Sequence, residues 1–527
     1  AQAASYLASL HLPLSQRDGS ILVASADAGE ARSRELRARY GTDSQILQVE
    51  TSALVSQIEQ RFRTRLSRDA NFALDRADPQ LSARRVITIK QVGACAAAGA
   101  FAALGVALAP MTASIVLVAT LSLAFVANVA FRALLVWIGA AQQSPALPCR
   151  ELTLPSYTVL VPMYREARMV PQIVAALDAL DYPKSLLDIK LVLEADDEET
   201  FSAAQALQAD GGFEVVRVPP SALRTKPRAC NYALNFARGE FLVIYDAEDR
   251  PEPDQLRKAA ALFRSGPDNV ACLQARLNFY NARRNWLTTL FALDYGLWFD
   301  FLLPGLDRLG VPMPLGGTSN HLRTSVLREI HGWDPFNVTE DADLGIRLAE
   351  KGYRVSVLDS TTFEEASHSL ANWTRQRSRW LKGYIQTWLV HMRDPARLVR
   401  SVGWRGFIAF QLFVGGTFAS ALLNPLLWLV FVAGKFSGVA LFAPSIAADV
   451  AAISLIGLIA GNAFFTYLVL LGGYRRGWLD LVFCGLGAFA YWALISVAGY
   501  RGLFQLFLRP FHWEKTLHGL DAEEGLA

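Results

Sequence analysis

Cysteine, net charge and secretory signals are all scarce in this sequence of 527 residues. Its five cysteines lie far apart and form no Cys-x-x-Cys pair, which argues against a zinc site or a redox couple. We expect all five to be small packing residues: Cys95, Cys149, Cys230, Cys272 and Cys484. A formal charge of +3 over the whole chain is too small to indicate nucleic-acid binding. The first residues lack a basic stretch followed by an apolar core, so no signal peptide is expected.

Long uncharged runs are what the sequence has in excess. Hydrophobic residues make up 52% of the chain and concentrate in a few segments. The runs 86–110 and 111 to about 138 are each long enough to cross about 30 Å of hydrocarbon. Arg84 and Arg85 precede the first run, and the turn between the runs carries no basic residue. The positive-inside bias therefore predicts a transmembrane hairpin over 84–140 with both ends in the cytoplasm.

A second apolar region follows amphipathic interface helices expected over 381–406. Within 407–511, the runs at about 407–433 and 447–472 predict another hairpin. The third run, about 479–508, is too short to cross twice, and a single crossing would put Arg501 and the tail outside. We therefore expect either a broken or re-entrant helix near Gly499 or an interfacial helix from Arg501.

The first 75 residues have the mixed composition of a small cytoplasmic α/β module. A strand-like run at 21–24 follows the turn signal Asp18-Gly19, and a helical pattern covers 29–40. The module resembles the N-terminal domain of type II secretion ATPases through Leu12-Pro13-Leu14, Ala24-Ser25-Ala26-Asp27 and the 51–62 helix. Some members of that family bind cyclic di-GMP, but their Arg-rich repeat is not apparent here. Nucleotide sensing and docking of a partner protein both stay open.

Residues 151–380 return to a soluble composition with a regular alternation of strands and helices. Short β-rich runs lie at 158–161, 189–193, 214–218 and 241–245, with helical patterns between them. This rhythm predicts a parallel sheet, whose ligands bind outside the carboxyl ends of the strands. The polar residues that follow each run are therefore the candidate site residues.

Acidic and basic groups follow the first three predicted strands. Pro162, Tyr164 and Glu166 follow the first, and the segment Glu194-Ala195-Asp196-Asp197 follows the second. Such carboxylates can accept hydrogen bonds from a nucleobase edge, or they can cap a helix. The cluster Arg224 to Arg228, which includes Lys226, precedes a helix and suits a pyrophosphate, although a solvated basic turn has the same composition.

The fourth strand runs into Asp246-Ala247-Glu248-Asp249. Carboxylates at this spacing can converge on one hard divalent ion, Mg²⁺ or Mn²⁺, with diphosphate oxygens and water completing its shell. The ion would stabilise negative charge on a departing nucleoside diphosphate. The alternative is a solvated acidic turn.

Three later motifs complete the candidate site. Gly317, in a Gly-Gly pair, permits close approach of the backbone to a sugar or phosphate. Glu340 and Asp341 of Thr339-Glu340-Asp341 begin a helix, where a carboxylate is either a cap or a general base. Gln376, Arg379 and Trp380 share one helix face, where arginine can clamp phosphate and tryptophan can stack on a sugar. A membrane-interface aromatic beside a snorkelling arginine would look the same.

Together these motifs resemble processive family 2 glycosyltransferases such as bacterial cellulose, hyaluronan and chitin synthases. The joined Thr-Glu-Asp and Gln-x-x-Arg-Trp elements are the specific part, and the similarity covers about residues 86–519. The resemblance implies an α/β GT-A (Rossmann-like) catalytic domain embedded in an α-helical transmembrane bundle, in addition to the N-terminal module. It also implies a bacterial inner-membrane protein with a cytoplasmic catalytic domain.

The resemblance assigns roles to the candidate residues. Asp341 would be the general base, Asp246 with Glu248 or Asp249 the metal site, and Arg379 with Lys226 the diphosphate contacts. Trp380 would stack on the acceptor. Tyr164, Glu166 and Glu194 would line the base pocket, although Asp197 competes with Glu194 for the role of base-binding carboxylate. The tail 512–527 looks like a gating loop, in which Trp513, Lys515 and Thr516 would close over the nucleotide.

The implied function is a processive, inverting polymerisation of a β-linked polysaccharide from a nucleotide sugar, with UDP-glucose as the first choice. The polymer would cross the lipid bilayer between helices whose polar residues face inward, or else those residues join the helices to one another. These residues are Asn128, Arg132, Gln411, Asn424 and Asn462. Two alternatives remain: a non-processive transferase that glycosylates a lipid carrier, and a receptor whose enzyme domain is vestigial.

Overall fold

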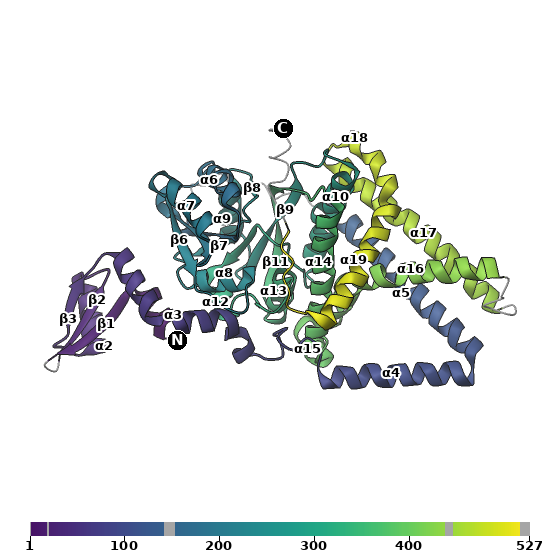
Figure 1. The fold of residues 1–527 in the computed structure, drawn as a ribbon, viewed down its shortest axis with the longest axis horizontal. Helices are drawn as coiled ribbons and strands as arrows, with labels where there is room; N and C mark the ends of the chain where they lie inside the picture. The colour runs from purple at the N-terminus through teal and green to yellow at the C-terminus, as the bar shows by residue number, and fades with distance from the viewer. Residues whose placement is uncertain (1, 18–19, 142–152, 438–445, 517–527) are drawn as a thin grey trace.

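The computed structural model describes residues 2–17, 20–141, 153–437 and 446–516. Three parts follow one another across the molecule, as Figure 1 shows: a small N-terminal module, a mixed α/β domain, and a group of long helices. The fold class expected from the sequence is confirmed, because an α/β domain, apolar helices and a small α/β module are all present.

The N-terminal module is built on three short strands. Its elements are α1 (Gln2–Ser9), β1 (His11–Arg17), β2 (Ser20–Ser25), α2 (Glu30–Tyr40) and β3 (Gln45–Gln48). β2 lies in the middle, antiparallel to β1 and parallel to β3. Buried Val23 and Leu36, with Ile58 of the next helix, form its core. The predicted turn at Asp18-Gly19 lies outside the described residues.

Helix α3 (Thr51–Ala77) is 27 residues long, much longer than the 51–62 helix expected from the sequence. Its first half buries Leu54 and Ile58 in the module, and its second half packs against helix α8 (Lys226–Leu234) of the α/β domain. One continuous helix therefore joins the module to the catalytic domain (Figure 1).

The α/β domain contains one sheet of eight strands in the order β6-β5-β4-β7-β10-β9-β11-β8. The strands predicted from the sequence form β4 (Tyr157–Met163), β5 (Leu187–Glu194), β6 (Phe213–Val218) and β7 (Phe241–Ile244), which are mutually parallel. The other half consists of β8 (Arg250–Pro251), β9 (Val270–Phe279), β10 (Asn320–Arg323) and β11 (Arg354–Glu364). β10 is antiparallel to both of its neighbours, so the sheet is mixed rather than purely parallel.

Both faces of this sheet are buried, because alternate side chains of each strand point to opposite faces. Val159 and Leu191 contribute to one apolar cluster, together with helices α6 (Val170–Asp178) and α9 (Gln255–Ser265). Leu160 and Val192 contribute to the cluster on the opposite face, with α8. The carboxyl ends of the parallel strands are left at one edge, which is where the candidate site lies.

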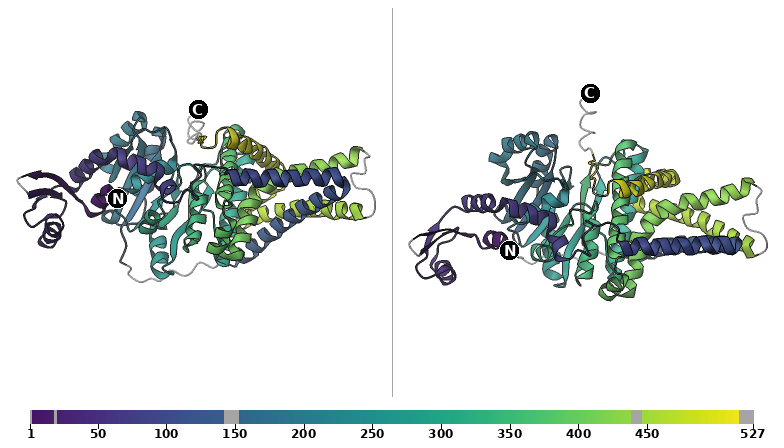
Figure 2. Two further views of the ribbon diagram at one scale, coloured as in Figure 1. Left: turned by 90° about the horizontal axis from the view of Figure 1, so that it is seen from below. Right: turned by 60° about the horizontal axis from the view of Figure 1, so that its bottom comes forward.

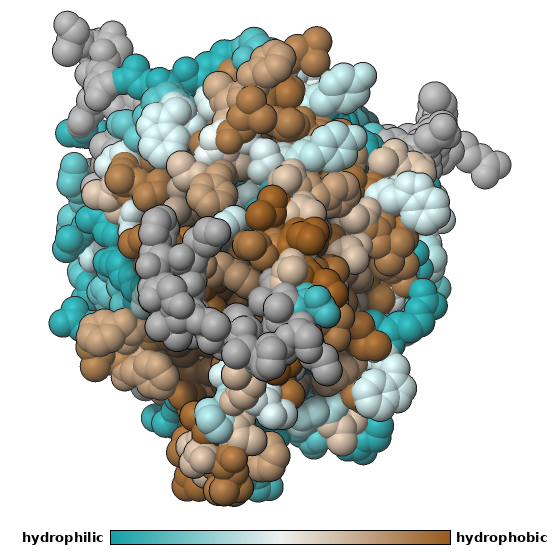
Figure 3. Space-filling view, turned by 90° about the vertical axis from the view of Figure 1, so that its right-hand side faces the viewer, coloured by the Kyte–Doolittle hydropathy of each residue, from teal (hydrophilic) through white to brown (hydrophobic). Residues whose placement is uncertain are grey.

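Five segments of the described residues are long and apolar enough to span a membrane. The first two are α4 (Ile89–Leu108) and α5 (Pro110–Ala140). Helices α15 (Pro395–Phe410) and α16 (Gly416–Ser437), joined by the π-helical turn η4 (Gln411–Gly415), form the third, and α17 (Ile446–Arg475) forms the fourth. These helices extend away from the catalytic domain in both views of Figure 2. Seen from their far end, apolar side chains dominate the centre of the surface (Figure 3).

The fifth segment does not show the first of the two expected alternatives, a broken or re-entrant helix near Gly499. It consists of α18 (Leu479–Val482), the 3₁₀ turn η5 (Phe483–Gly487) and the continuous helix α19 (Ala488–Leu508). α19 lies along α14 (Leu370–His391), so closely that a Cβ on Gly502 would be 2.6 Å from the Ser378 carbonyl oxygen. The glycines of this helix permit close packing instead of a bend.

Both ends of the fifth segment contact the α/β domain. Asp480 at its start forms an ion pair with Arg283 at 3.0 Å, and the Lys382 Nζ donates to the His512 carbonyl oxygen just after its end at 2.8 Å. The start and the end of this segment therefore both lie beside the α/β domain. This brings the following residues, 513–516, to the catalytic domain.

The cysteines do not all pack as expected. Cys230 and Cys272 are buried in the α/β domain. Cys95 on α4 and Cys484 in η5 are exposed, so the expectation that they pack inside the protein is wrong. Both lie on apolar segments, on a side that no other described part of the chain covers. Cys149 lies outside the described residues.

Candidate active site

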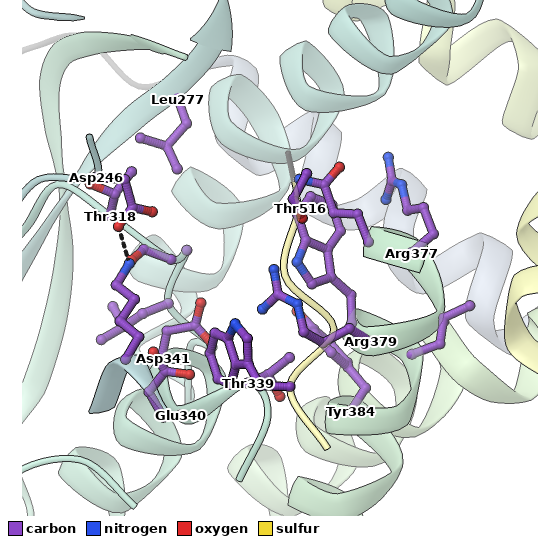
Figure 4. Close-up of a pocket in the computed structure, with 18 of the residues that line it drawn as sticks. Asp246, Leu277, Thr318, Thr339, Glu340, Asp341, Arg377, Arg379, Tyr384 and Thr516 are labelled. Atoms are coloured by element: carbon purple, nitrogen blue, oxygen red, sulfur yellow. Dashed lines mark hydrogen bonds and ion pairs between the residues drawn. The ribbon is translucent and has the colours of Figure 1, made fainter. Parts of the chain in front are cut away.

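A single cavity of about 1100 Å³ joins the strand ends of the sheet to the long helices. Figure 4 shows its central part, where Asp246, Asp341 and Arg379 point toward the same space from three different elements. Most residues predicted from the sequence line this cavity: Pro162, Tyr164, Glu166, Glu194, Lys226, Asp246, Glu248, Gly317, Glu340, Asp341, Gln376, Arg379, Trp380, Trp513, Lys515 and Thr516. The cavity wall does not include Asp197 or Asp249.

At the end of β5, Glu194 and not Asp197 faces the cavity. Both carboxylate oxygens of Glu194 accept hydrogen bonds from Arg228 Nη1 at 3.2 Å. Burial raises the pKa of Glu194, and the Arg228 charge opposes that rise. Asp197 instead caps helix α7 (Glu198–Gly211), because its side chain accepts from the Thr200 amide.

Helix α3 contributes to the same wall, which the sequence did not indicate. Asn71 lines the cavity beside Phe72, and its Oδ1 accepts a hydrogen bond from Arg228 Nε at 3.0 Å. Ser67, one turn earlier, lies 3.4 Å from Arg228 Nη2. The residues that hold Arg228 against Glu194 are therefore supplied partly by the helix that begins in the N-terminal module.

At the next strand end, two of the three predicted carboxylates face the cavity. Asp246 forms a short ion pair with Lys226, whose Nζ also donates to the Gly317 carbonyl oxygen at 2.7 Å. Glu248 lines the cavity as well. Asp249 is fully buried, and its Oδ2 accepts from the Asp246 amide at 2.8 Å and from Thr318 Oγ1. The geometry favours Asp246 and Glu248 as cavity groups and Asp249 as the residue that shapes the turn.

This set of residues fits a divalent ion that is completed by the substrate. Within the described residues, no group of three or more acidic, histidine or cysteine side chains closes around a cation. Carboxylate oxygens are the ligands that Mg²⁺ and Mn²⁺ prefer, and Asp246 and Glu248 both contribute carboxylates to the cavity wall. Asp246 and Glu248 would hold the ion, which would supply positive charge to a bound diphosphate.

Glu364, at the end of β11, is a cavity carboxylate that the sequence analysis missed. Its Oε1 is buried and has no hydrogen-bond partner among the described residues. Burial raises its pKa well above the ordinary value, and the charges of Asp249, Glu248 and Asp246 raise it further. Its place at a strand end was the signal that could have revealed it.

Asp341 occupies the first turn of α13 (Glu340–Glu350) and faces the centre of the cavity. A Cβ on Gly317 would lie 3.3 Å from Asp341 Oδ2, so glycine leaves room beside the carboxylate. Burial raises the pKa of Asp341, and the charges of Lys226 and Arg379 counteract that rise. Burial, together with the Asp341 charge, raises the pKa of Glu340 to about 8. An ionised Asp341 can accept a proton from a hydroxyl group placed in this space.

The described end of the tail closes one side of the cavity. The Trp513 ring covers the Arg379 guanidinium with 4.5 Å between the Arg379 Cζ and the ring centroid. Lys515 Nζ lies 3.1 Å from Glu166 Oε1. Thr516 Oγ1 and Arg379 Nε are buried without a hydrogen-bond partner in the described residues. Both atoms are therefore available to form hydrogen bonds with a bound ligand. The rest of the predicted gating loop, from Leu517 on, lies outside the described residues.

Trp380 is held by residues beneath it. The Trp380 ring stacks on the Tyr295 ring with 6.1 Å between centroids. The Arg377 guanidinium lies 4.8 Å from the centroid of the Trp380 ring. Arg377 forms an ion pair with Asp294 at 2.8 Å and donates a hydrogen bond to Tyr491 of α19. Arg377 lies inside the predicted motif, but the helix-face pattern alone did not reveal this role.

The cavity continues between the membrane helices. Asn128, Arg132, Asn424 and Asn462 line it, as the sequence analysis expected. Gln411 is not in the cavity wall, so of the two roles considered for these residues it has the second, which is to join helices to one another. Its side chain accepts from Trp388 Nε1 at 2.8 Å and contacts Met392 Sδ, so it joins η4 to the α14 region.

Parts of this chain are similar in sequence to known glycosyltransferases. Residues 241–496 match the family model described as glycosyl transferase family group 2. A probable glycosyltransferase of Bacillus subtilis, YdaM, is 26% identical over 234 residues, which cover 44% of this chain and 55% of the relative. A beta-monoglucosyldiacylglycerol synthase of Trichormus variabilis is 25% identical over 242 residues, which cover 45% of this chain and 50% of the relative. The chain thus spans about half the length of these curated relatives.

Among solved structures, the mannosyltransferase PcManGT from Pyrobaculum calidifontis, in complex with GDP-Man and Mn²⁺, is 17% identical with a TM-score of 0.45. The similarity covers 74% of this chain and 99% of that chain. Residues 1–349 of S. aureus TarS are 14% identical with a TM-score of 0.33, over 69% of this chain and 97% of theirs.

Proposed function

We propose that the chain, whose residues 241–496 match the model of glycosyl transferase family group 2, is a membrane-embedded, inverting hexosyltransferase that polymerises a β-linked polysaccharide from a nucleotide sugar. UDP-glucose is the first donor to test. One observation carries the proposal: a single cavity extends from Glu194 and Asp246, past Asp341 and Trp380, to Asn462 between the membrane helices. A donor at one end and a growing chain at the other can meet at Asp341.

The proposed reaction is a single displacement. Asp341 takes the proton of an acceptor hydroxyl, and the hydroxyl oxygen forms a bond to the anomeric carbon of the donor sugar. The bond from that carbon to the nucleoside diphosphate breaks on the opposite side, so an α-linked donor gives a β-linked product. Lys226 and Arg379 neutralise the departing diphosphate. A divalent ion held by Asp246 and Glu248 would add positive charge at the same place.

The acceptor is proposed to lie against Trp380. A tryptophan ring offers a flat apolar face to a sugar ring, and Gln376 Oε1, buried without a hydrogen-bond partner in the described chain, can accept from a sugar hydroxyl. Trp513, Lys515 and Thr516 close over the diphosphate from the other side. A polymer leaving this point would pass the amides of Asn424 and Asn462. These amides can form hydrogen bonds with its hydroxyl groups, which would otherwise face lipid.

A second function is favoured by one of the relatives. The name beta-monoglucosyldiacylglycerol synthase describes a transferase with a lipid product. A cavity that opens between membrane helices would serve a lipid acceptor as well as a polymer, and every proposed catalytic residue would keep its role. This candidate is a non-processive transferase that glycosylates a lipid.

The setting is proposed to be the bacterial inner membrane with the catalytic domain in the cytoplasm, where nucleotide sugars are made. Basic residues lie at the domain end of the helices, in agreement with the positive-inside bias: Arg84 and Arg85 before α4, and Arg475 and Arg476 at the end of α17. The N-terminal module is proposed to bind cyclic di-GMP or a partner protein.

The test is turnover by the purified chain in lipid nanodiscs. A panel of sugar nucleotides is supplied with Mg²⁺ or Mn²⁺, release of nucleoside diphosphate is measured, and radiolabelled product is sized. High-molecular-weight product that disappears in Asp341→Asn, and persists in the exposed control Asp181→Asn, supports the processive synthase. A product limited to lipid-linked monosaccharide supports the second candidate, and absence of turnover with every donor contradicts both.

A further inference from the structure

Arg132 of α5 is an unusual component of the membrane part of the cavity. Among the described residues, it is the only charged side chain that the candidate membrane spans contribute to the cavity wall. It is 6% exposed. A buried cation in a membrane helix is energetically costly and is therefore a candidate functional residue.

The partners of Arg132 are neutral. Its Nε donates to Asn128 Oδ1 at 3.1 Å, and its Nη2 donates to Thr417 Oγ1 at 2.9 Å. The guanidinium also lies over the rings of Phe413 and Phe465, at 5.5 Å and 5.3 Å from their centroids. Within the described chain, no carboxylate forms an ion pair with it.

Asp294 is a carboxylate of the same cavity, but it is already paired. Its Oδ2 is held by Arg377 at 2.8 Å. The described partners of Arg132 are all neutral, so none of these contacts balances its positive charge. A neutral amide at position 132 could make the same two hydrogen bonds at a smaller desolvation cost, so the charge itself indicates an anionic ligand.

Arg132 and Asp341 line one continuous cavity. The Arg132 guanidinium lies over Phe413, whose ring is 4.7 Å from that of Trp298 between centroids. Trp298 in turn contacts Tyr384 at 6.3 Å, and Figure 4 shows Tyr384 beside Arg379 in the part of the cavity that holds Asp341. One molecule in the cavity can therefore contact Arg132 and Asp341 together.

We propose that Arg132 binds an acidic group of the acceptor, a phosphate or a carboxylate, while a hydroxyl of the same acceptor lies at Asp341. The proposal rests on the transferase function proposed above and specifies the acceptor. Its anionic oxygens can come from a lipid phosphate or from an acidic sugar of a glycan, because both present the geometry that a guanidinium binds.

Binding without turnover is the first experiment. The full chain in phosphatidylcholine nanodiscs is dialysed against two matched pairs of radiolabelled probes, with empty nanodiscs subtracted. One pair is short-chain phosphatidylglycerol and short-chain diacylglycerol, and the other is a glucuronic-acid-terminated disaccharide and its glucose-terminated counterpart. Wild-type protein is expected to prefer the acidic member of one pair, and that pair identifies the source.

Three variants assign the preference to Arg132. Arg132→Gln keeps the hydrogen-bonding capacity and is expected to weaken binding of the acidic probe at least tenfold, with no change for the neutral probe. Arg132→Lys keeps the charge and should lose less than threefold. Lys90→Gln, which removes an exposed cation of α4 outside the cavity, should change nothing.

The inference is overturned if wild-type protein shows no acidic preference in either pair, or if Arg132→Gln weakens acidic and neutral probes equally. Acceptor turnover is measured separately on the same preparations. A protein that binds the acidic probe through Arg132 but transfers no sugar to it contradicts the proposed function and leaves the binding site standing.

Discussion

Asn71 of helix α3 accepts a hydrogen bond from Arg228, and Arg228 in turn donates to Glu194 in the cavity wall at the end of β5. The three residues form a buried chain of hydrogen bonds from a helix that begins in the N-terminal module to the predicted donor pocket. Tyr232 and Asn231 of α8 also donate to α3, to Glu59 and to the Ala70 carbonyl oxygen, so the chain through Asn71 is one of several contacts that join this helix to the α/β domain.

Replacement of Asn71 is expected to weaken donor binding more than catalysis. Asn71→Ala removes a hydrogen bond to a buried charge, worth about 1.5–3 kcal/mol, and lets Arg228 and Glu194 shift. We expect the donor KM to rise about tenfold or more, with kcat changed by less than about threefold. Steady-state kinetics on the donor measures both. Gln57→Ala, on an exposed turn of the same helix, is the control, and an equal loss of kcat in Asn71→Ala would contradict a positioning role.

Removal of divalent ions is expected to stop transfer, and the carboxylates are expected to respond differently. Glu248→Gln should raise the Mg²⁺ or Mn²⁺ concentration needed for half-maximal activity, because Glu248 faces the cavity. Asp249→Asn should instead lower Tm, because Asp249 accepts from the Asp246 amide and from Thr318. Metal titrations of activity and thermal unfolding separate the two effects. A shifted metal dependence in Asp249→Asn alone would reverse the assignment.

His391 is expected to stabilise the protein only while it is protonated. Its ring lies between Glu350, at 2.5 Å, and Asp343, at 3.1 Å, and these carboxylates raise its pKa to about 9 despite burial. A raised pKa means that the stabilisation is complete below the unfolded pKa of about 6.5 and is lost as pH rises through about 9. The size at neutral pH or below is on the order of 3 kcal/mol.

The measurement is the difference in Tm between wild type and His391→Gln as a function of pH. The difference should be large at pH 6 and should shrink toward pH 10. The exposed His331, whose pKa burial lowers, gives the control His331→Asn, which should show no such trend between pH 7 and 10. A difference for His391→Gln that is independent of pH would contradict the ion pairs.

Alanine substitutions at two glycines of α19 are expected to have very different effects on Tm. A Cβ on Gly502 would be 2.6 Å from the Ser378 carbonyl oxygen, whereas a Cβ on Gly499 would make ordinary contacts at 3.4 Å or more. Gly502→Ala should therefore push α19 away from α14, lower Tm and disturb the residues that follow, Trp513 to Thr516. Gly499→Ala should keep wild-type Tm and activity. Equal behaviour of the two variants would mean that α19 does not pack on α14 as described.

Local patterns were sufficient to predict the parallel half of the sheet and most of the candidate site. Each apolar run of the 158–245 region forms a strand, and the polar residues that follow these strands meet because parallel strands end at the same edge. The choice between Glu194 and Asp197, and between Glu248 and Asp249, could not be made in this way. Both members of each pair follow the same strand, and only packing decides which side chain caps a turn.

The sequence by itself determined the strand-end carboxylates, the motif with Asp341 and Trp380, and the long apolar helices, because these depend on residue type and short-range spacing. Only the tertiary structure decided that α3 supplies Asn71 to the cavity wall and that α19 lies along α14. It also decided that Asp294 pairs with Arg377, whereas Arg132 has no carboxylate partner in the described part of the chain. Those contacts join residues tens to hundreds of positions apart. Their geometry follows from how whole helices pack, which no local pattern of residues records.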